Sequence, residues 1–242
     1  MLALVTRPRE DSEAVARALE TRGLTVMIEP LLDIEPATGT SVDGGGIQGI
    51  LVTSGNGIRA LARLLPDRSL PVWAVGESSA RIARELGYAT VTSADGDVEA
   101  LAALVIERVD PAGGALLHPA GTVTAGDLAG RLAARGFDIR RQTLYRATTA
   151  TALSPGLVAA MTGGTIDLAL FFSPRTAATF ARLILAAGQA ATLAGTVGYA
   201  LSANVETELA GLPWRALRRA EQPTQAALLA VIDHDLERGF IR

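Results

Sequence analysis

Apolar runs and amphipathic segments alternate along the whole chain. Leu2–Val5 and Gly49–Val52 are short apolar runs typical of buried strands, whereas Glu10–Arg22 carries its apolar residues at helical spacing. Regular alternation of strands with helices favours parallel sheets that are covered by helices on both faces. The pattern therefore predicts an α/β protein built on doubly wound parallel sheets.

The pattern also occurs twice. The strand at 2–5 is followed by a helical segment over 10–22, and a second strand at 115–118 is followed by one over 123–135; both helical segments close with Arg-Gly. Later strands repeat as well, and in each copy a strand runs into a Ser that opens a helix, at Ser54 and at Ser173. We infer a duplicated α/β unit, and hence two similar lobes with a cleft between them.

Two extended runs occupy the same place in each repeat. Leu24–Glu35 and Phe137–Thr149 are longer than a typical strand of 5–6 residues. We predict that they pass from one lobe to the other, side by side, as linker strands over about 28–36 and 142–150. Pro and Gly residues beyond each run are typical of linkers.

Two domain partitions are compatible with this pattern. A tandem arrangement places the boundary near Asp110-Pro111. A crossed arrangement makes one discontinuous domain from 1–35 and 150–242, with 36–147 inserted as the other. We favour the crossed arrangement because it alone explains the two long runs.

Composition narrows the function. The 242 residues are 49% hydrophobic and 19% charged, which allows a sizeable core. The formal net charge of −3 argues against a nucleic-acid partner, and the absence of cysteine, with only two histidines, argues against a metal site. No apolar stretch is long enough to cross a bilayer and the start does not resemble a signal peptide, so we expect a cytoplasmic protein without a membrane partner.

Small polar residues follow most of the predicted strands. In parallel sheets ligands bind outside the carboxyl ends of the strands, where helix N-termini present free N–H groups. The candidate ligand-binding residues are Arg7, Thr53, Ser54, Asn56, Gly76, Ser78, Ser79, Ser173, Arg175, Ser202, Asn204 and Thr224. Such a surface suits carboxylate or phosphate groups, although each hydroxyl alone is more simply explained as a helix N-cap.

Tyr145 lies on the second long run, where its side chain could face the cleft. The phenol could donate a proton or a hydrogen bond to a leaving group. Its ring could equally pack against a lobe. Arg7, Arg146 and Arg175 are candidate partners for anions because guanidinium pairs well with carboxylate, whereas Arg140 and Arg141 are expected on a solvated strand face.

Taken together, these turns resemble the uroporphyrinogen-III synthase family over nearly the whole chain. The matching motifs are Val5-Thr6-Arg7-Pro8, Val52-Thr53-Ser54-Gly55-Asn56-Gly57, Ala74-Val75-Gly76-Glu77-Ser78-Ser79, Thr143-Leu144-Tyr145-Arg146, Phe171-Phe172-Ser173-Pro174-Arg175, Ala200-Leu201-Ser202 and Glu221-Gln222-Pro223-Thr224. The chain departs from the family pattern at His118-Pro119, where an Arg-Gly pair is common, and after Ser202.

The resemblance implies two flavodoxin-like domains joined by a two-stranded β-ladder. It implies a lyase that cyclises hydroxymethylbilane to uroporphyrinogen III, with loss of water and inversion of ring D, in tetrapyrrole biosynthesis and without a cofactor. Tyr145 matches the residue proposed to assist departure of the hydroxyl. We expect this chain to be a monomer that binds hydroxymethylbilane, and a transient contact to the preceding pathway enzyme stays open.

Two other classes compete with this prediction. A two-lobed protein of this kind could be a non-catalytic binder of an anionic small molecule, without chemistry of its own. A pair of receiver-like regulatory domains is less favoured, because the first strand ends without the paired acids of a phosphoacceptor site.

Overall fold

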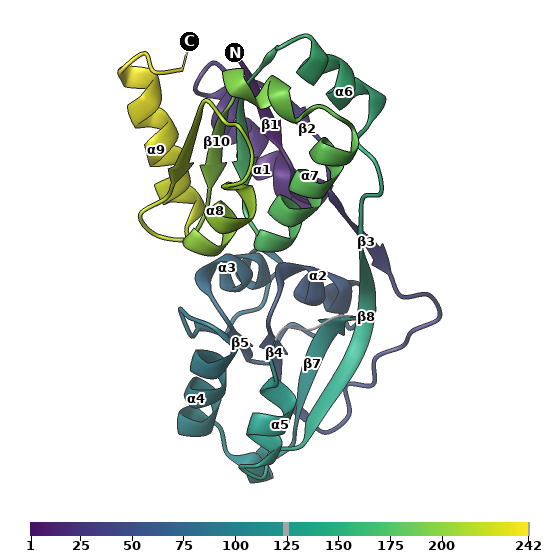
Figure 1. Ribbon diagram of the computed structural model, residues 1–242. Helices are drawn as coiled ribbons and strands as arrows, with labels where there is room; N and C mark the ends of the chain where they lie inside the picture. The colour runs from purple at the N-terminus through teal and green to yellow at the C-terminus, as the bar shows by residue number, and fades with distance from the viewer. Residues whose placement is uncertain (123–125, 242) are drawn as a thin grey trace. The chain divides into compact units, whose positions relative to one another are not determined.

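The computed structural model describes residues 1–122 and 126–241, and strands alternate with helices throughout (Figure 1). The strands are β1 (Leu2–Val5), β2 (Thr25–Ile28), β3 (Leu32–Pro36), β4 (Ile47–Val52), β5 (Val72–Ala74), β6 (Val91–Ser93), β7 (Ala115–Gly121), β8 (Ile139–Thr149), β9 (Ile166–Phe171), β10 (Val197–Ala200) and β11 (Ala216–Arg219). The α-helices are α1 (Arg9–Glu20), α2 (Gly55–Leu64), α3 (Glu77–Glu85), α4 (Val98–Arg108), α5 (Leu128–Ala133), α6 (Pro155–Thr162), α7 (Pro174–Ala186), α8 (Ala203–Leu209) and α9 (Gln225–Glu237). Short 3-10 helices lie at Pro111–Gly113 and Ala190–Gly195.

The chain divides into two compact units. Unit 1 comprises Met1–Asp33 and Thr148–Arg242, and unit 2 comprises Ile34–Ala147. The chain passes from one unit to the other within β3 and again within β8.

Both units contain the same parallel sheet. In unit 1 the strand order is β2-β1-β9-β10-β11, and in unit 2 it is β8-β7-β4-β5-β6 with β3 added beside β8. Neighbouring strands of the two five-stranded series are parallel. In unit 1, counting the strands along the chain from β1 gives the order 2-1-3-4-5, which is flavodoxin-like. In unit 2, the same order results when the count starts at β7, continues with β8 and then returns to β4, β5 and β6. This equivalence confirms the predicted fold class, and it matches the sequence repeat that pairs the strand at 2–5 with the strand at 115–118.

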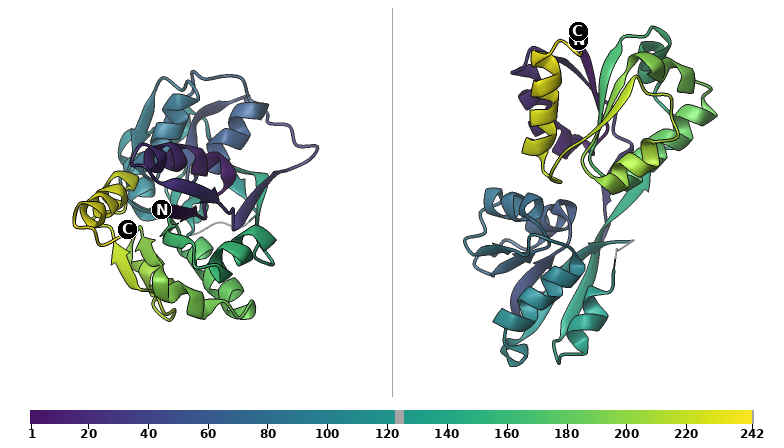
Figure 2. Two further views of the ribbon diagram at one scale, coloured as in Figure 1. Left: turned by 90° about the horizontal axis from the view of Figure 1, so that it is seen from above. Right: turned by 60° about the vertical axis from the view of Figure 1, so that its left-hand side comes forward.

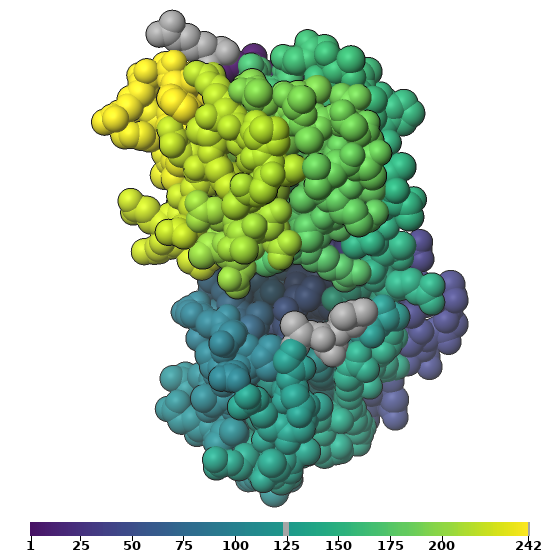
Figure 3. Space-filling model, in the orientation of Figure 1, coloured from purple at the N-terminus to yellow at the C-terminus, as the bar shows by residue number. Residues whose placement is uncertain are grey.

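Helices cover both faces of each sheet because successive strand residues point to opposite faces. In unit 1, Leu4 packs with α6, α7 and α8, whereas Val5 packs with α1 and α9. The right-hand view of Figure 2 shows α9 and α7 on opposite sides of this sheet. In unit 2, Val52 packs with α2 and α3, and Leu51 packs with α4 and α5. Little of the purple β1 is visible in the space-filling view, because later segments cover this central strand (Figure 3).

The first long extended run is two strands, not one. Beyond β2, Glu29 N donates to Val5 O and Leu31 N donates to Thr6 O, so the chain stays bonded to the β1 segment on both sides of Pro30. The next strand, β3, pairs instead with β8; bonds from Ala37 N to Leu144 O and from Ala150 N to Leu31 O place these two strands antiparallel. The second long run is a single strand, β8, of 11 residues.

The helix predicted over 123–135 is shorter than expected. Its residues 123–125 lie outside the described residues, and α5 begins at Leu128 after Asp127, whose carboxylate accepts a hydrogen bond from Gly130 N. The Arg-Gly pairs behave as predicted from the repeat. Gly23 and Gly136 follow α1 and α5 with φ of 77° and 85°, a left-handed conformation that glycine adopts at helix ends without strain.

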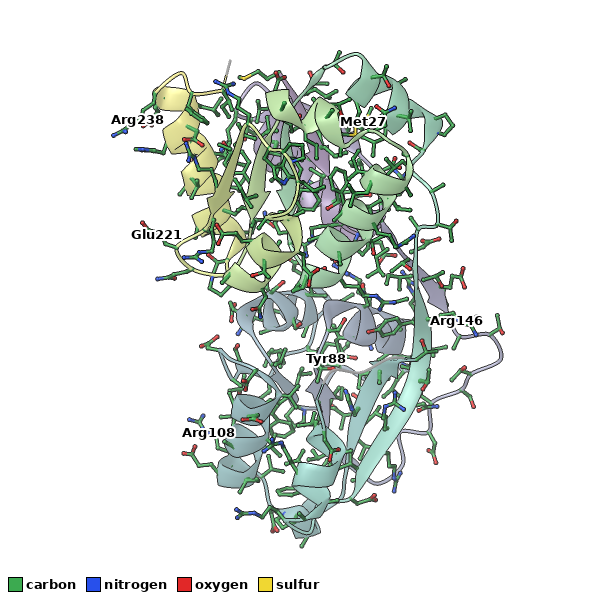
Figure 4. All side chains as sticks on the ribbon, viewed as in Figure 1. Met27, Tyr88, Arg108, Arg146, Glu221 and Arg238 are labelled. Carbon is green, nitrogen blue, oxygen red and sulfur yellow. The ribbon has the colours of Figure 1, made fainter. Side chains whose placement is uncertain are left out.

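Within the described residues, no helix is both long and apolar enough to span a membrane. Charged side chains such as Arg108 on α4 and Arg238 at the end of α9 are exposed and point away from the sheets (Figure 4).

Candidate functional site

The candidate residues follow the carboxyl ends of strands in both sheets, and some of them lie where the strand order reverses. In an open α/β sheet this switch point lies between the strands counted first and third, and ligands bind outside their carboxyl ends. In unit 1 these strands are β1 and β9, which end beside Arg7 and Ser173. In unit 2 they are β7 and β4, which end beside Gly121 and Thr53.

Ser54 and Tyr145 are in contact at the switch point of unit 2. Ser54 is the N-cap of α2, and its Oγ accepts a hydrogen bond from Asn56 N at 3.1 Å. The phenol of Tyr145 donates to the same Oγ at 3.3 Å. Both contacts use Ser54 as an acceptor, so its own O–H has no acceptor in the described part of the chain. The Ser54 hydroxyl can therefore donate to a ligand while it caps the helix.

The ring of Tyr145 is buried, with 8% of the residue exposed. It packs on Gly121, where an added Cβ would lie 2.8 Å from Cε2 and 2.9 Å from Cζ of the ring. The ring therefore packs in unit 2, as one interpretation of Tyr145 held, and the phenol hydrogen-bonds at the carboxyl end of β4. Donation to a leaving group stays a prediction.

α2 starts very close to β7. An added Cβ at Gly57 would lie 2.4 Å from the carbonyl oxygen of Pro119. Only glycine allows this approach, which brings the first turn of α2 beside the end of β7. Asn56, in the same turn, accepts a hydrogen bond from Arg59 Nη1 through its side-chain Oδ1 at 3.3 Å.

Thr53 precedes Ser54 and contacts a histidine. Its Oγ1 lies 3.1 Å from Nε2 of His118 on β7. Burial, with a smaller contribution from the charge of Arg141, lowers the pKa of His118 to about 4. The imidazole is therefore neutral near pH 7.

The next strand, β5, leads into α3 with glycine at the cap. Gly76 is the N-cap and offers no side-chain acceptor, so the first N–H groups of α3 are not capped by a side chain. Ser78 is exposed and Ser79 is buried in this first turn. β5 lies beside β4 in the sheet, which places this turn next to the Thr53–Ser54 turn.

In unit 1 the switch point carries a cation and a hydroxyl. The guanidinium of Arg7 lies 4.6 Å over the ring of Phe172 and pairs with Asp11 at 3.4 Å. Ser173, at the end of the neighbouring β9, caps α7 and accepts a hydrogen bond from Thr176 N at 3.2 Å. These contacts hold both side chains at the carboxyl edge of the sheet.

The remaining candidates of unit 1 follow β9, β10 and β11. Arg175 is exposed in the first turn of α7. Ser202 precedes α8 without capping it, Asn204 is exposed in the first turn of that helix, and Thr224 caps α9 by accepting from Ala227 N at 3.2 Å. Ser54, Ser173 and Thr224 are therefore N-caps, as the simpler interpretation of these residues held.

Two features of unit 2 were not recognised from the sequence. Arg141 is exposed, as expected for a solvated strand face, but the hydrogen bond from its Nη2 to Gly121 O at 3.0 Å was not predicted. The contact of His118 with Thr53 was not predicted either. No local sequence pattern joins His118 to Thr53, and the contact follows from the pairing of β7 with β4. Arg146 on β8 is exposed and is labelled in Figure 4.

A separate cavity of about 250 Å³ lies between α2 and α3. Its lining residues are Arg59, Ala62, Arg63, Arg68, Ile82, Glu85 and Leu86. The Arg68 guanidinium donates to Ala62 O at 2.6 Å and to Leu86 O at 3.1 Å, which ties the ends of the two helices together. The described residues contain no group of three or more acidic, histidine or cysteine side chains arranged to hold a metal ion.

Comparison with known proteins identifies the family. The family model described as uroporphyrinogen-III synthase HemD matches residues 13–230. The chain belongs to this family. Uroporphyrinogen-III synthases are enzymes of tetrapyrrole biosynthesis, and the uroporphyrinogen-III synthase of Chlorobaculum parvum (strain DSM 263 / NCIMB 8327) is 28% identical over 196 residues, covering 73% of this chain and 76% of the relative.

Two solved structures of uroporphyrinogen-III synthases share the fold. The enzyme from Helicobacter pylori 26695 has a TM-score of 0.62 at 13% identity, covering 97% of this chain and 99% of the other. A mutant of the enzyme from the extremely thermophilic bacterium Thermus thermophilus has a TM-score of 0.53 at 17% identity, covering 98% of this chain and 100% of the other. At these identities the likeness supports the fold and not the site residues.

Proposed function

We propose that this chain is a lyase that converts hydroxymethylbilane to uroporphyrinogen III, with loss of water and inversion of ring D. The proposed reaction is that of the family, and one structural observation supports the proposal for this chain. Equivalent switch points in both units present hydroxyl groups and helix N-termini at the carboxyl ends of their strands.

The substrate is a linear tetrapyrrole with eight carboxylates, and its binding needs many modest donors. Ser54 and Ser173 provide hydroxyl groups, and the first turns of α2, α3 and α7 provide backbone N–H groups at the positive ends of helix dipoles. We infer that the donors of both units bind one bilane. The proposed contacts are Arg7, Thr53, Ser54, Asn56, Gly76, Ser78, Ser79, Ser173, Arg175, Ser202, Asn204 and Thr224.

Tyr145 is the proposed catalytic residue. Its phenol already has a hydrogen-bonding partner in Ser54 Oγ, and it turns from that oxygen to the hydroxyl of the bilane when substrate binds. The C–O bond of the hydroxymethyl group breaks and the electron pair leaves with oxygen, which takes the proton of the phenol and departs as water. The phenolate then regains a proton from the pyrrole carbon that forms the closing bond. The buried ring limits the freedom of the phenol and so fixes its direction.

Positioning is the larger part of the proposed catalysis. Once water has left, the cationic end can close directly or through the inverted ring by way of a spiro intermediate. We infer that contacts from both sheets hold the two ends of the bilane and so favour the inverted route. The enzyme needs no cofactor in this scheme. We propose that it works as a monomer in the cytoplasm, with or without a transient contact to the enzyme that supplies the bilane.

The competing proposal is a non-catalytic binder of an anionic small molecule. Separation of the product isomers distinguishes the two. Incubation of purified protein with hydroxymethylbilane is expected to give uroporphyrinogen III, whereas a binder would leave only the type I isomer that forms spontaneously. Heat-inactivated protein provides the control for the spontaneous reaction.

A further inference from the structure

His118 lies inside the sheet of unit 2, and one of its ring nitrogens lacks a partner. It is part of β7, with 3% of the residue exposed. Nε2 lies 3.1 Å from Thr53 Oγ1, and the buried Nδ1 has no hydrogen-bonding partner within the described residues. The second histidine of the chain, His234, is exposed on α9.

The ring carries a single N–H near neutral pH. Burial disfavours the charged imidazolium, and Arg141, the register partner of His118 on β8, adds like charge. Arg141 is held beside the ring because its guanidinium donates to Gly121 O at 3.0 Å. The N–H is therefore either on Nε2, facing Thr53, or on the unpartnered Nδ1.

The two tautomers give Thr53 opposite roles. With the proton on Nδ1, the buried Nδ1–H has no acceptor, and the Thr53 hydroxyl must donate its hydrogen bond to Nε2. With the proton on Nε2, the ring donates to Thr53 Oγ1 and the hydroxyl hydrogen remains available. Orphaned N–H donors are rarer in protein interiors than under-satisfied acceptors, which favours the second tautomer.

We propose that His118 is a positioning residue that makes Thr53 a hydrogen-bond donor. Nε2–H of His118 donates to Thr53 Oγ1, and the Thr53 hydroxyl then points its hydrogen outward at the carboxyl end of β4, toward a carboxylate of the ligand. Thr53 is half-buried, and its Oγ1 has no other hydrogen-bonding partner in the described ranges. Since Ser54 also keeps a free O–H, this turn offers two adjacent hydroxyl donors. That the ligand is the bilane rests on the proposed function.

The tautomer can be measured without substrate. Protein labelled with ¹⁵N at histidine gives signals from two rings, and His234→Gln removes one of them for assignment. At pH 7.5 the long-range ¹H–¹⁵N spectrum of His118 is expected to show a protonated Nε2 and a bare Nδ1. A protonated Nδ1 would overturn the proposal.

Kinetics test the consequence for the substrate. His118→Leu removes the ring donor and is expected to raise KM about fivefold, with kcat within about twofold, since it weakens one contact of many. His118→Gln keeps a side-chain N–H in reach of Thr53 and is expected to restore KM to within about twofold of the parent. In a Thr53→Val background, His118→Leu should change KM no further, because the two residues act as a unit.

A fall in kcat at unchanged KM, or an equal rise in KM with and without the Thr53 hydroxyl, would overturn the positioning role. If the parent protein forms no type III isomer, the proposed function fails instead. The spectrum then still decides the state of the His118–Thr53 pair.

Discussion

The phenol of Tyr145 donates a hydrogen bond to the hydroxyl of Ser54, 3.3 Å away and 91 positions earlier in the chain. The pair joins the strand that links the units to the cap of α2, at the switch point of the sheet in unit 2. The proposed catalytic group and a proposed binding group therefore share one hydrogen bond. Their separate contributions can be distinguished by substitution.

Tyr145→Phe is expected to lower kcat by at least about tenfold, since it removes the proposed donor to the departing hydroxyl. Folding should change little, because a net loss of about 1 kcal/mol is typical for one neutral hydrogen bond and Ser54 keeps its bond from Asn56 N. Formation of the type III isomer measures the first effect and thermal unfolding measures the second. Full activity in this variant would show that the phenol is not the donor.

Gly121→Ala tests the position of the Tyr145 ring without removing the phenol. The new Cβ would lie 2.8 Å from the ring, so the ring must shift. We expect a loss of kcat similar to that of Tyr145→Phe and a destabilisation of about 1–3 kcal/mol from overpacking. Gly211→Ala is the matched control, because an added Cβ there meets nothing within 4 Å. Parent-like kcat in Gly121→Ala would mean that the placement of the ring does not matter for turnover.

Ser54→Ala and Ser173→Ala are each expected to reduce kcat/KM only several-fold, because many donors share the carboxylates. Each should also cost about 1 kcal/mol of stability through loss of an N-cap. Asp97→Ala removes a side-chain cap from α4, outside the proposed site, and serves as the control for the effect of cap loss on stability. A hundredfold loss in either site variant would contradict binding by distributed contacts.

Stability should fall as the pH is lowered from about 6.5 to about 4 because of His118. Its pKa in the folded protein is about 4, below the ordinary value of 6.5, so over this range the unfolded chain binds a proton that the folded chain does not. Above about pH 6.5, the lowered pKa of His118 contributes fully to the free energy of unfolding. Its contribution there is about 3 kcal/mol, since each pKa unit between the two values corresponds to about 1.36 kcal/mol.

Denaturant unfolding of the parent and of His118→Gln across this range isolates that contribution, since other titrating groups are common to both proteins. The parent curve should be steeper than that of the variant between pH 4 and 6.5. Parallel curves would show that the imidazole titrates alike in the folded and unfolded chains.

Most of the fold could be predicted because the signals are local. Alternating apolar runs and helical spacing located the strands, and the repeat of the strand at 2–5 at 115–118 implied equivalent sheets. The division of 24–35 into β2 and β3 was missed because it follows from a change of pairing partner, from β1 to β8. The local pattern of apolar and polar residues does not show which strand a segment pairs with.

The site was less accessible to such reasoning. Hydroxyl residues at strand ends could be selected by position, but capping and ligand binding call for the same residue types, as Ser54, Ser173 and Thr224 illustrate. The contacts between Tyr145 and Ser54 and between His118 and Thr53 join distant parts of the sequence, and no local pattern predicts them.

Amide hydrogen exchange with and without uroporphyrinogen III tests the central claim, that the carboxyl edges of both sheets bind one ligand. Saturating product should slow exchange in the first turns of α2 and α3 in unit 2 and of α7 and α8 in unit 1, while the helices remote from these edges exchange as before. Protection confined to one unit, or absent from both edges, would contradict the account.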